Sequence, residues 1–235
     1  MLQEITPGGR LVWYWSTFDH ISPSEFDGRF WPTAQSYSAP YYDIYHWNSI
    51  ELSGSDVIVS YRHLDAVYDI NKDGNAGNVG SIRWKLGGSH TAQSLTVLND
   101  PVFSSGGTLC GQHDARVLGD GTLTLHDNGT NCGRAPRAVR YRVDAIARTA
   151  SLVERVTDPD APLSSCCGSA RKLPGGDWVM EWGLRPFVTE LTSTGSRVFK
   201  LTFGDNLFSY RADPIVPGRL ARSALRAGMD AQYPR

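Results

Sequence analysis

The sequence has no large excess of charge of either sign, no long hydrophobic run and only four cysteines. Charged residues make up 20% of the 235 residues and the formal net charge is -1, which excludes a basic nucleic-acid-binding protein as the expected class. No window approaches ~18 uninterrupted apolar residues, so we expect no membrane-spanning helix. Residues 1–7 lack the basic and apolar regions of a signal peptide, which indicates a cytosolic chain or a true N-terminus further upstream.

The cysteine pattern is not that of a small disulfide-stapled domain. There is no Cys-x-x-Cys pair, and the adjacent Cys166 and Cys167 cannot both ligate zinc in ordinary tetrahedral geometry without strain. A structural disulfide, free thiols and a metal site all stay open as alternatives. Cys110 and Cys132 flank the segment that holds His113, so a disulfide between them would brace that segment.

Aromatic residues, glycine and proline are frequent instead. The 11% aromatic content, 24 glycines and 13 prolines favour a β-rich protein with many turns, and an all-β chain of this length often forms one domain. Residues 11–15, Leu-Val-Trp-Tyr-Trp, predict a strand. No earlier segment looks able to pair with it, so the chain is expected to open in the middle of a sheet. Residues 21–42 predict a long ordered loop.

From residue 45 onward the sequence repeats a unit of four strands. Leu52, Leu118 and Leu173 take equivalent places before the first turn of each unit. The predicted strands cover residues 46–52, 57–62, 66–70 and 81–86 in unit one, 113–118, 122–126, 138–143 and 150–156 in unit two, and 168–173, 178–182, 187–191 and 197–203 in unit three.

Four-stranded units without a helical period between them are typical of a β-propeller. We therefore expect an all-β fold in which residues 1–235 form a single, partial propeller of about three full blades with flanking strands. The predicted blades cover residues 45–88, 110–156 and 166–204. Residues 1–44 are expected to end an upstream blade and continue as a loop, and residues 205–235 to provide an opening strand at 207–211 and a tail.

The polar residues that head the strands form a candidate site. In a propeller the first strand of each blade lines the central channel, and His46 and His113 head the first strands of two neighbouring units. Arg62 ends the second strand of unit one, and Asn128 takes the matching place in unit two. Such a donor-rich pocket suits a sulfuryl or phosphoryl group, which a histidine can carry covalently as the nucleophile. Buried structural histidines are the alternative interpretation.

The same residues lie in segments that together resemble the arylsulfotransferase (ASST) family. The match runs from about Leu11 to Arg211 and consists of many short motifs in the family's order. The motifs are His-Trp-Asn-Ser-Ile at 46–50 preceded by Asp43, Ser-Tyr-Arg at 60–62, Trp-Lys-Leu-Gly-Gly at 84–88, Gln-His-Asp-Ala-Arg at 112–116, Asp-Asn-Gly at 127–129, the glycine-rich 168–176, Trp-Gly at 182–183 and Phe-Ser-Tyr-Arg at 208–211.

The resemblance implies a six-bladed propeller that moves a sulfuryl group from a phenolic sulfate ester to a phenol, without a nucleotide donor, cofactor or metal. The family's nucleophilic histidine falls on His113, which would form a sulfohistidine. His46, Asn48 and Arg62 would hold the sulfuryl oxygens, and one histidine would protonate the departing phenolate. Asn128 and Asp114 complete the predicted substrate-binding group, Asp114 by orienting His113 or bracing a turn.

Four further side chains are given ordinary structural roles. His63 and His126 are interpreted as strand residues, and Arg116 and Arg211 as partners of carboxylates. The family is mostly bacterial and exported, which implies an extracellular or periplasmic location.

The resemblance also implies what this chain lacks. Family members carry further blades upstream, including another histidine-bearing segment that helps to build the site, and no such segment is present here. The alternative function is therefore a non-catalytic propeller that binds a small anionic or aromatic ligand, or another protein, at a degenerate site. A lyase or hydrolase on the same scaffold is a third possibility. Pairing with another copy of the chain would cover the open sheet edges of a partial ring.

Overall fold

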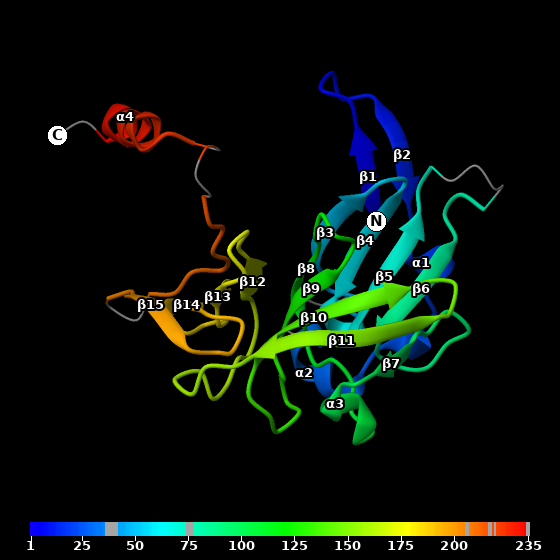
Figure 1. Ribbon diagram of the computed structural model, residues 1–235. Helices are drawn as coiled ribbons and strands as arrows, with labels where there is room; N and C mark the ends of the chain where they lie inside the picture. The colour runs from blue at the N-terminus through cyan, green and yellow to red at the C-terminus, as the bar shows by residue number, and fades with distance from the viewer. Residues whose placement is uncertain (36–41, 74–77, 205–206, 216–217, 219, 234–235) are drawn as a thin grey trace.

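The computed structural model describes residues 1–35, 42–73, 78–204, 207–215, 218 and 220–233. These residues form a two-stranded hairpin and three larger β-sheets, with short helices in the connections (Figure 1). The predicted β-rich class is confirmed. The sheets are open, and the described residues do not close into a ring.

The first strand predicted from the sequence, β2 (Leu11–Trp15), pairs with an earlier strand, β1 (Leu2–Ile5), in an antiparallel hairpin. The expectation that no earlier segment could pair with it is wrong. Four residues with one buried side chain, Leu2, are enough once a turn brings the chain back. The hairpin is anchored at Trp15, which is 2% exposed and donates its indole N–H to the Gly80 carbonyl at 2.8 Å.

The connection to the first large sheet contains short helices, and those that follow residue 21 lie where a loop was predicted. Two of these helices begin at capping side chains, because Ser22 accepts the Ser24 N–H and Asp27 accepts the Arg29 N–H. Residues 36–41 of the predicted loop lie outside the described residues. The helices are α1 (Thr17–His20), η1 (Pro23–Glu25), η2 (Gly28–Phe30) and α2 (Trp31–Gln35).

The three predicted units appear as three sheets in which the predicted strands pair antiparallel, and each predicted strand is confirmed to within about a residue at its ends. The first sheet contains β3 (Trp47–Ser53), β4 (Asp56–Tyr61), β5 (Ala66–Asn71) and β6 (Ile82–Gly87). The second contains β8 (His113–Val117), β9 (Leu123–Asp127), β10 (Arg137–Asp144) and β11 (Thr149–Val156). The third contains β12 (Ser169–Lys172), β13 (Trp178–Glu181), β14 (Phe187–Leu191) and β15 (Arg197–Thr202).

Two short elements between the first and second sheets were not predicted. The strand β7 (Thr96–Leu98) adds to the edge of the second sheet, parallel to β11, and makes it five-stranded. The helix α3 (Pro101–Ser104) follows and is capped by the Asp100 side chain. Both elements are too short to give a periodic pattern in the sequence.

Neighbouring sheets pack face to face through the apolar side chains that alternate along their strands. One buried cluster joins the first sheet to the second, and another joins β10 and β11 to the third sheet. The first cluster includes Ile58, Val67, Leu86, Leu123, Leu125 and Val139, and the second includes Ala138, Val156, Trp178, Met180 and Trp182.

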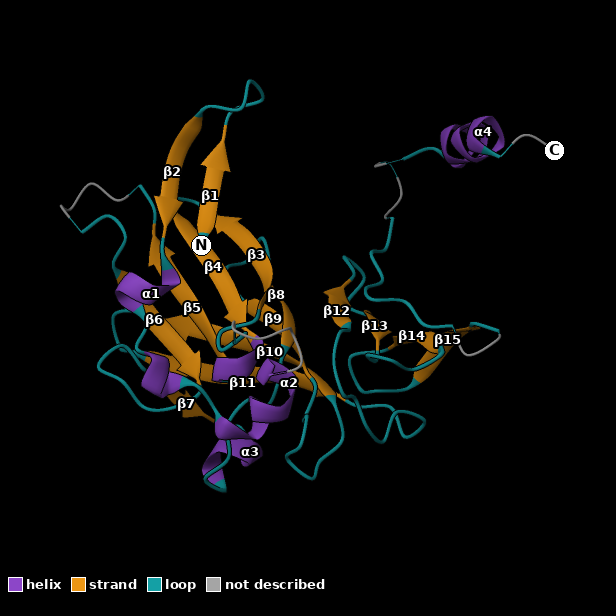
Figure 2. Cartoon of the chain, turned by 180° about the vertical axis from the view of Figure 1, so that it is seen from behind, coloured by secondary structure: helices purple, strands orange, loops and turns teal. Residues whose placement is uncertain are grey.

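The C-terminal part differs from its prediction. Residues 207–211 do not form the expected opening strand and are instead tied to the start of the third sheet, where the Gly168 N–H donates to the Tyr210 carbonyl at 2.9 Å. The chain then forms α4 (Arg222–Gln232), which has no buried residue and lies apart from the sheets in both views (Figures 1 and 2). Within the described part of the chain, no helix is both long and apolar enough to cross a membrane.

A disulfide joins Cys110 and Cys132, which are separated by 22 residues. Of the alternatives open for these two cysteines, the structural disulfide is confirmed. Both cysteines line a cleft of about 550 Å³, together with Arg29 and Arg134. The cross-link ties the residue before Gly111 to the loop after β9, and so braces the strand that begins at His113.

We predict that the double variant Cys110→Ser/Cys132→Ser loses about 3 kcal/mol of unfolding free energy, the chain-entropy value for a loop of this size. Urea unfolding followed by tryptophan fluorescence measures the loss. Addition of a thiol reductant should lower the stability of the wild type toward that of the variant and leave the variant unchanged. Equal stability of both proteins under oxidising conditions would show that the bridge does not brace the fold.

Candidate active site

His113, the first residue of β8, is held by hydrogen bonds at both ring nitrogens. Its Nδ1 lies 2.9 Å from the Gly111 carbonyl and 2.9 Å from the Asn128 Oδ1, which both accept. Its Nε2 lies 3.1 Å from the Cys167 backbone N–H, which donates. These partners require a neutral ring with the proton on Nδ1 and the lone pair on Nε2. The side chain is 1% exposed, and burial lowers the pKa of His113 to about 3.

The segment Ser164–Ser165–Cys166–Cys167, called the 164–167 segment below, lies across the site and contacts it mainly through its backbone. The Asn128 amide donates to Ser164 Oγ at 2.6 Å and to the Cys167 carbonyl at 2.9 Å. Asn128 therefore joins the nucleophile candidate to this segment. The close approach also needs Gly168, since a Cβ there would lie 2.1 Å from His126 Nδ1.

The backbone under His113 is fixed by a buried carboxylate. Asp65 Oδ1 accepts the Gly111 N–H at 2.6 Å, and its other oxygen pairs with Arg29. Burial raises the pKa of Asp65 to about 7. Because the Gly111 carbonyl is an acceptor for His113 Nδ1, Asp65 positions the histidine through one peptide unit.

Arg62 follows β4 directly, as the first residue of the short helix η3 (Arg62–Leu64), and is 5% exposed. Its guanidinium donates to the Ser165 carbonyl at 2.8 Å and lies 4.7 Å from the centre of the Phe30 ring. Asn128 likewise follows β9 directly, so the two residues do occupy matching places in their units. The positive charge of Arg62 is close enough to contribute to the low pKa of His113, after burial.

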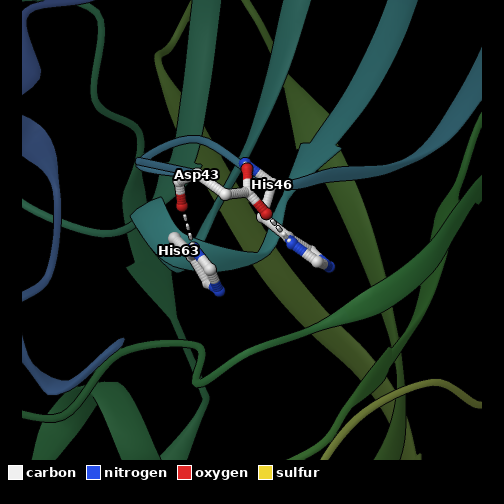
Figure 3. A group of neighbouring side chains, drawn as sticks. All are labelled: Asp43, His46 and His63. Carbon is white, nitrogen blue, oxygen red and sulfur yellow. Dashed lines mark hydrogen bonds and ion pairs between the residues drawn. The ribbon is translucent and has the colours of Figure 1, made fainter. Parts of the chain in front are cut away.

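His46, the residue before β3, lies in a group with Asp43 and His63 (Figure 3). The Asp43 carboxylate bonds the Nδ1 of His46 and accepts its backbone N–H at 3.1 Å. The His46 ring stacks on the His63 ring with their centres 4.6 Å apart. Burial alone would raise the pKa of Asp43, but its hydrogen bond to His46 holds that pKa below the usual range. Asp43 thus fixes the tautomer and direction of His46.

The three side chains of this group are close enough together to hold a metal ion, but their contacts favour an orienting role. His63 Nδ1 is 2.6 Å from the Asp43 carbonyl, and His63 Nε2 is 2.7 Å from an Arg62 guanidinium nitrogen. A cation bound here would lie beside that fixed positive charge. The interpretation of His63 as a strand residue is wrong, because it lies in η3, buried against His46.

Asn48 and Asp114 each face a backbone or charged partner. The Asn48 amide donates to the Gln112 carbonyl at 2.7 Å, and so connects β3 to the residue before His113. Asp114 is fully buried at φ 58° and pairs with three arginines. The predicted carboxylate partners Arg116 and Arg211 are two of these, and the third is Arg171; their nitrogens lie 3.1, 3.3 and 2.9 Å from Asp114 oxygens. Asp114 therefore ties three segments together next to His113.

Two buried groups beside the site were not predicted as part of it. His126 in β9 pairs with His113 across the strands, and its Nδ1 lies 3.3 Å from the Cys167 carbonyl. Glu181, at the end of β13, is buried and accepts the Gly183 N–H at 3.1 Å. Burial lowers the pKa of His126 to about 4 and raises that of Glu181 to about 8. The predicted hairpin places His126 opposite His113, and this placement could have identified His126 as part of the site. Nothing in the sequence indicated the 164–167 segment.

Comparison with known proteins gives one family. The model of the family described as Arylsulfotransferase (ASST) matches residues 1–204. No curated protein matches the chain.

Two solved structures are similar at low identity. A Bacteroides caccae protein of unknown function has a TM-score of 0.42 and 13% identity over 70% of this chain and 48% of its own. Virginiamycin B lyase from Staphylococcus aureus has a TM-score of 0.38 and 16% identity over 68% of this chain and 42% of its own. The chain thus spans less than half the length of either protein.

We predict that His126 makes the fold sensitive to acid. Its folded-state pKa of about 4 lies below the ordinary value of 6.5, so its contribution to stability is complete above pH 6.5 and is lost as the pH falls toward 4. Between pH 7 and pH 4, His126→Phe should lose about 3 kcal/mol less unfolding free energy than the wild type. Urea unfolding at several pH values measures how the unfolding free energy of each protein depends on pH.

The matched control is His90→Phe, at an exposed position. This variant should show the same pH dependence of the unfolding free energy as the wild type. Parallel stability curves for the wild type and His126→Phe would contradict the burial of a neutral His126.

Proposed function

The chain belongs to the arylsulfotransferase (ASST) family, and we propose that it moves a sulfuryl group from an aryl sulfate ester to a phenol through a sulfohistidine at His113. The observation that carries the proposal is the convergence of His113, Arg62 and Asn128 on the 164–167 segment. The His46 ring stacks on His63, which in turn contacts the Arg62 guanidinium. A neutral imidazole, a buried guanidinium and amide donors suit transfer of an anionic group. A nucleotide donor has no part in it.

The proposed first step forms a bond between His113 Nε2 and the sulfur of the aryl sulfate. The bond between sulfur and the phenolic oxygen breaks, and its electron pair leaves with the phenolate. In the second step the oxygen of an acceptor phenol attacks the same sulfur, and the nitrogen–sulfur bond breaks. The low pKa of His113 keeps the ring neutral, and its lone pair present, at any pH well above 3.

His46 is the proposed proton carrier. It donates a proton to the departing phenolate, is neutral between the two steps, and takes a proton from the acceptor phenol, while the Asp43 carboxylate stabilises the charged form of the ring. Arg62 stabilises the negative charge on the sulfuryl oxygens. Asn48, Asn128 and Asp114 are proposed to complete the substrate-binding group, Asp114 by holding β8 in place and Asn128 by holding His113.

We further propose that the three sheets are blades of a propeller, six-bladed in the complete family fold, with residues 1–235 as one domain. The division into blades at 45–88, 110–156 and 166–204, flanked by 1–44 and 205–235, follows the sheets closely. An extracellular or periplasmic location is supported by the Cys110–Cys132 disulfide, because such bonds persist in oxidising compartments. Pairing with a second copy at the exposed edge strand β15 stays a prediction, which the mass in solution tests.

A second candidate function rests on the burial of His113. A histidine that is 1% exposed and bonded at both nitrogens also suits a non-catalytic module that binds an anion or an aromatic ligand near Arg62. Only the enzyme would form a covalent adduct with the sulfuryl group, so this adduct distinguishes the two candidate functions.

We predict that the purified chain, incubated with 4-nitrophenyl sulfate and no acceptor, gains one sulfuryl group on the peptide that contains His113. Peptide mass analysis detects this group under mildly alkaline conditions, which preserve the nitrogen–sulfur bond of sulfohistidine. His113→Asn should give no adduct, whereas His126→Phe should still give one.

One nitrophenol molecule should be released for each protein molecule that forms the adduct. A folded wild type that binds the ester without forming an adduct, both as purified and after treatment with glutathione disulfide, would favour the binding module. Release of nitrophenol in many turnovers without an acceptor would instead indicate a hydrolase or lyase on this scaffold.

We predict that Asp43→Asn lowers kcat on the order of tenfold with little change in KM, because the amide no longer stabilises a charged His46. The loss should be larger for phenyl sulfate than for 4-nitrophenyl sulfate, since nitrophenolate leaves without much help from a proton. Steady-state rates with both esters measure this. The exposed Asp73 provides the control variant Asp73→Asn, and an equal loss for both esters would contradict the proposed role of His46.

A further inference from the structure

Cys166 and Cys167 are free thiols on adjacent residues just before β12. Cys166 is partly exposed and Cys167 is buried. Cys167 has a φ of 64°, the left-handed region that residues other than glycine rarely adopt. The pair is therefore held in an uncommon local conformation.

The peptide unit that joins these two cysteines is the one that contacts the nucleophile candidate. Its N–H, from Cys167, donates to His113 Nε2 at 3.1 Å. Its carbonyl, from Cys166, packs against Gly183 so closely that a Cβ there would lie 2.1 Å from the oxygen. In this conformation the lone pair of His113 that the proposed reaction uses is occupied.

We propose that Cys166 and Cys167 form a thiol-oxidation site, in which a small disulfide compound converts the pair into a bridge between adjacent residues and thereby frees His113 Nε2. The consequence of this oxidation for catalysis rests on the proposed function.

The geometry of the chain explains why the bridge frees the histidine. Adjacent Cα atoms are about 3.8 Å apart across a trans peptide, whereas disulfides usually join Cα atoms about 4.4–6.8 Å apart. A bridge between neighbours therefore closes a small ring that contains the 166–167 peptide unit and turns it from its present orientation. The Cys167 N–H then no longer points at His113. The strain in the ring also makes the bridge easy to reduce, so the change is reversible.

The chemistry balances with glutathione disulfide as the oxidant. The neighbouring Cys167 thiol and the charge of Arg62 lower the pKa of Cys166 to about 7, so the Cys166 thiolate is available near neutral pH. The Cys166 thiolate attacks one glutathione sulfur and displaces a glutathione thiolate. The Cys167 sulfur, after losing its proton, attacks Cys166 and displaces the second. The two cysteines lose two electrons, and two glutathione molecules carry away the two protons as thiols.

The test follows the bridge and the access to His113 separately, without using activity. The protein is treated with glutathione disulfide or left untreated, then labelled with diethyl pyrocarbonate, which reacts with a free imidazole lone pair. Peptide mass analysis then detects the 166–167 bridge and the label on each histidine. We expect the bridge to form and the labelling rate of His113 to rise about tenfold, the effect of losing one hydrogen bond of ordinary strength. The partly exposed His46 serves as the internal reference and should be labelled equally in both samples.

Cys166→Ser is the matched control, because it keeps the Cys167 N–H and cannot form the bridge. Its His113 should stay protected with and without glutathione disulfide. The inference is overturned if the bridge forms without a change at His113, if treatment stops at a mixed disulfide with glutathione, or if Cys166→Ser becomes labelled as fast as the oxidised wild type. If bridge and labelling behave as expected but the oxidised protein gains no sulfuryl group from an aryl ester, the inference holds and the proposed function fails.

Discussion

The site depends on the way the His113 ring is held between two sets of backbone and amide groups. Acceptors at Gly111 and Asn128 face Nδ1, and a donor at Cys167 faces Nε2. These groups come from the start of β8, the end of β9 and the segment before β12. The ring is therefore positioned only when the second and third sheets are packed together. Because a buried polar group without a partner costs roughly 1–3 kcal/mol, this arrangement also fixes how the sheets meet.

The buried charged residues around His113 also fix the position of its strand and the packing of the sheets. Asp65 and Asp114 are both buried, and each accepts a backbone N–H next to the histidine strand as well as bonds from arginine side chains. Burial raises the pKa values of both carboxyl groups, because a buried charge loses its hydration. The arginines offset part of the free-energy cost of burying the charged carboxylates. Such pairs contribute little net stability but strongly disfavour other packings, since breaking one leaves a charge buried. The result is a rigid polar centre between apolar sheet faces.

Much of this arrangement could be predicted from the sequence. The alternation of apolar residues and the glycine-containing turns define the strands of all three sheets, and the spacing of equivalent positions relates Arg62 to Asn128. Elements of three or four residues, such as β1 and β7, carry too few residues for a periodic signal. His63 was misassigned because Asp65 adopts a left-handed conformation that ends the turn of η3, a property that the residue type does not reveal. The contact of Cys167 with His113 is made by a backbone N–H, which every residue except proline has, so no motif could indicate it.

The protonation state of the two ring nitrogens of His113 tests the proposed chemistry most directly. Two-bond proton–nitrogen correlation spectra of the reduced protein, with histidine labelled in its ring nitrogens and His113→Asn for assignment, resolve the two nitrogens. The contacts predict a neutral ring at pH 7 with the proton on Nδ1 and an Nε2 that accepts a hydrogen bond. A proton on Nε2, or a charged ring, would contradict the role of His113 as nucleophile, because Nε2 would then have no lone pair with which to attack sulfur.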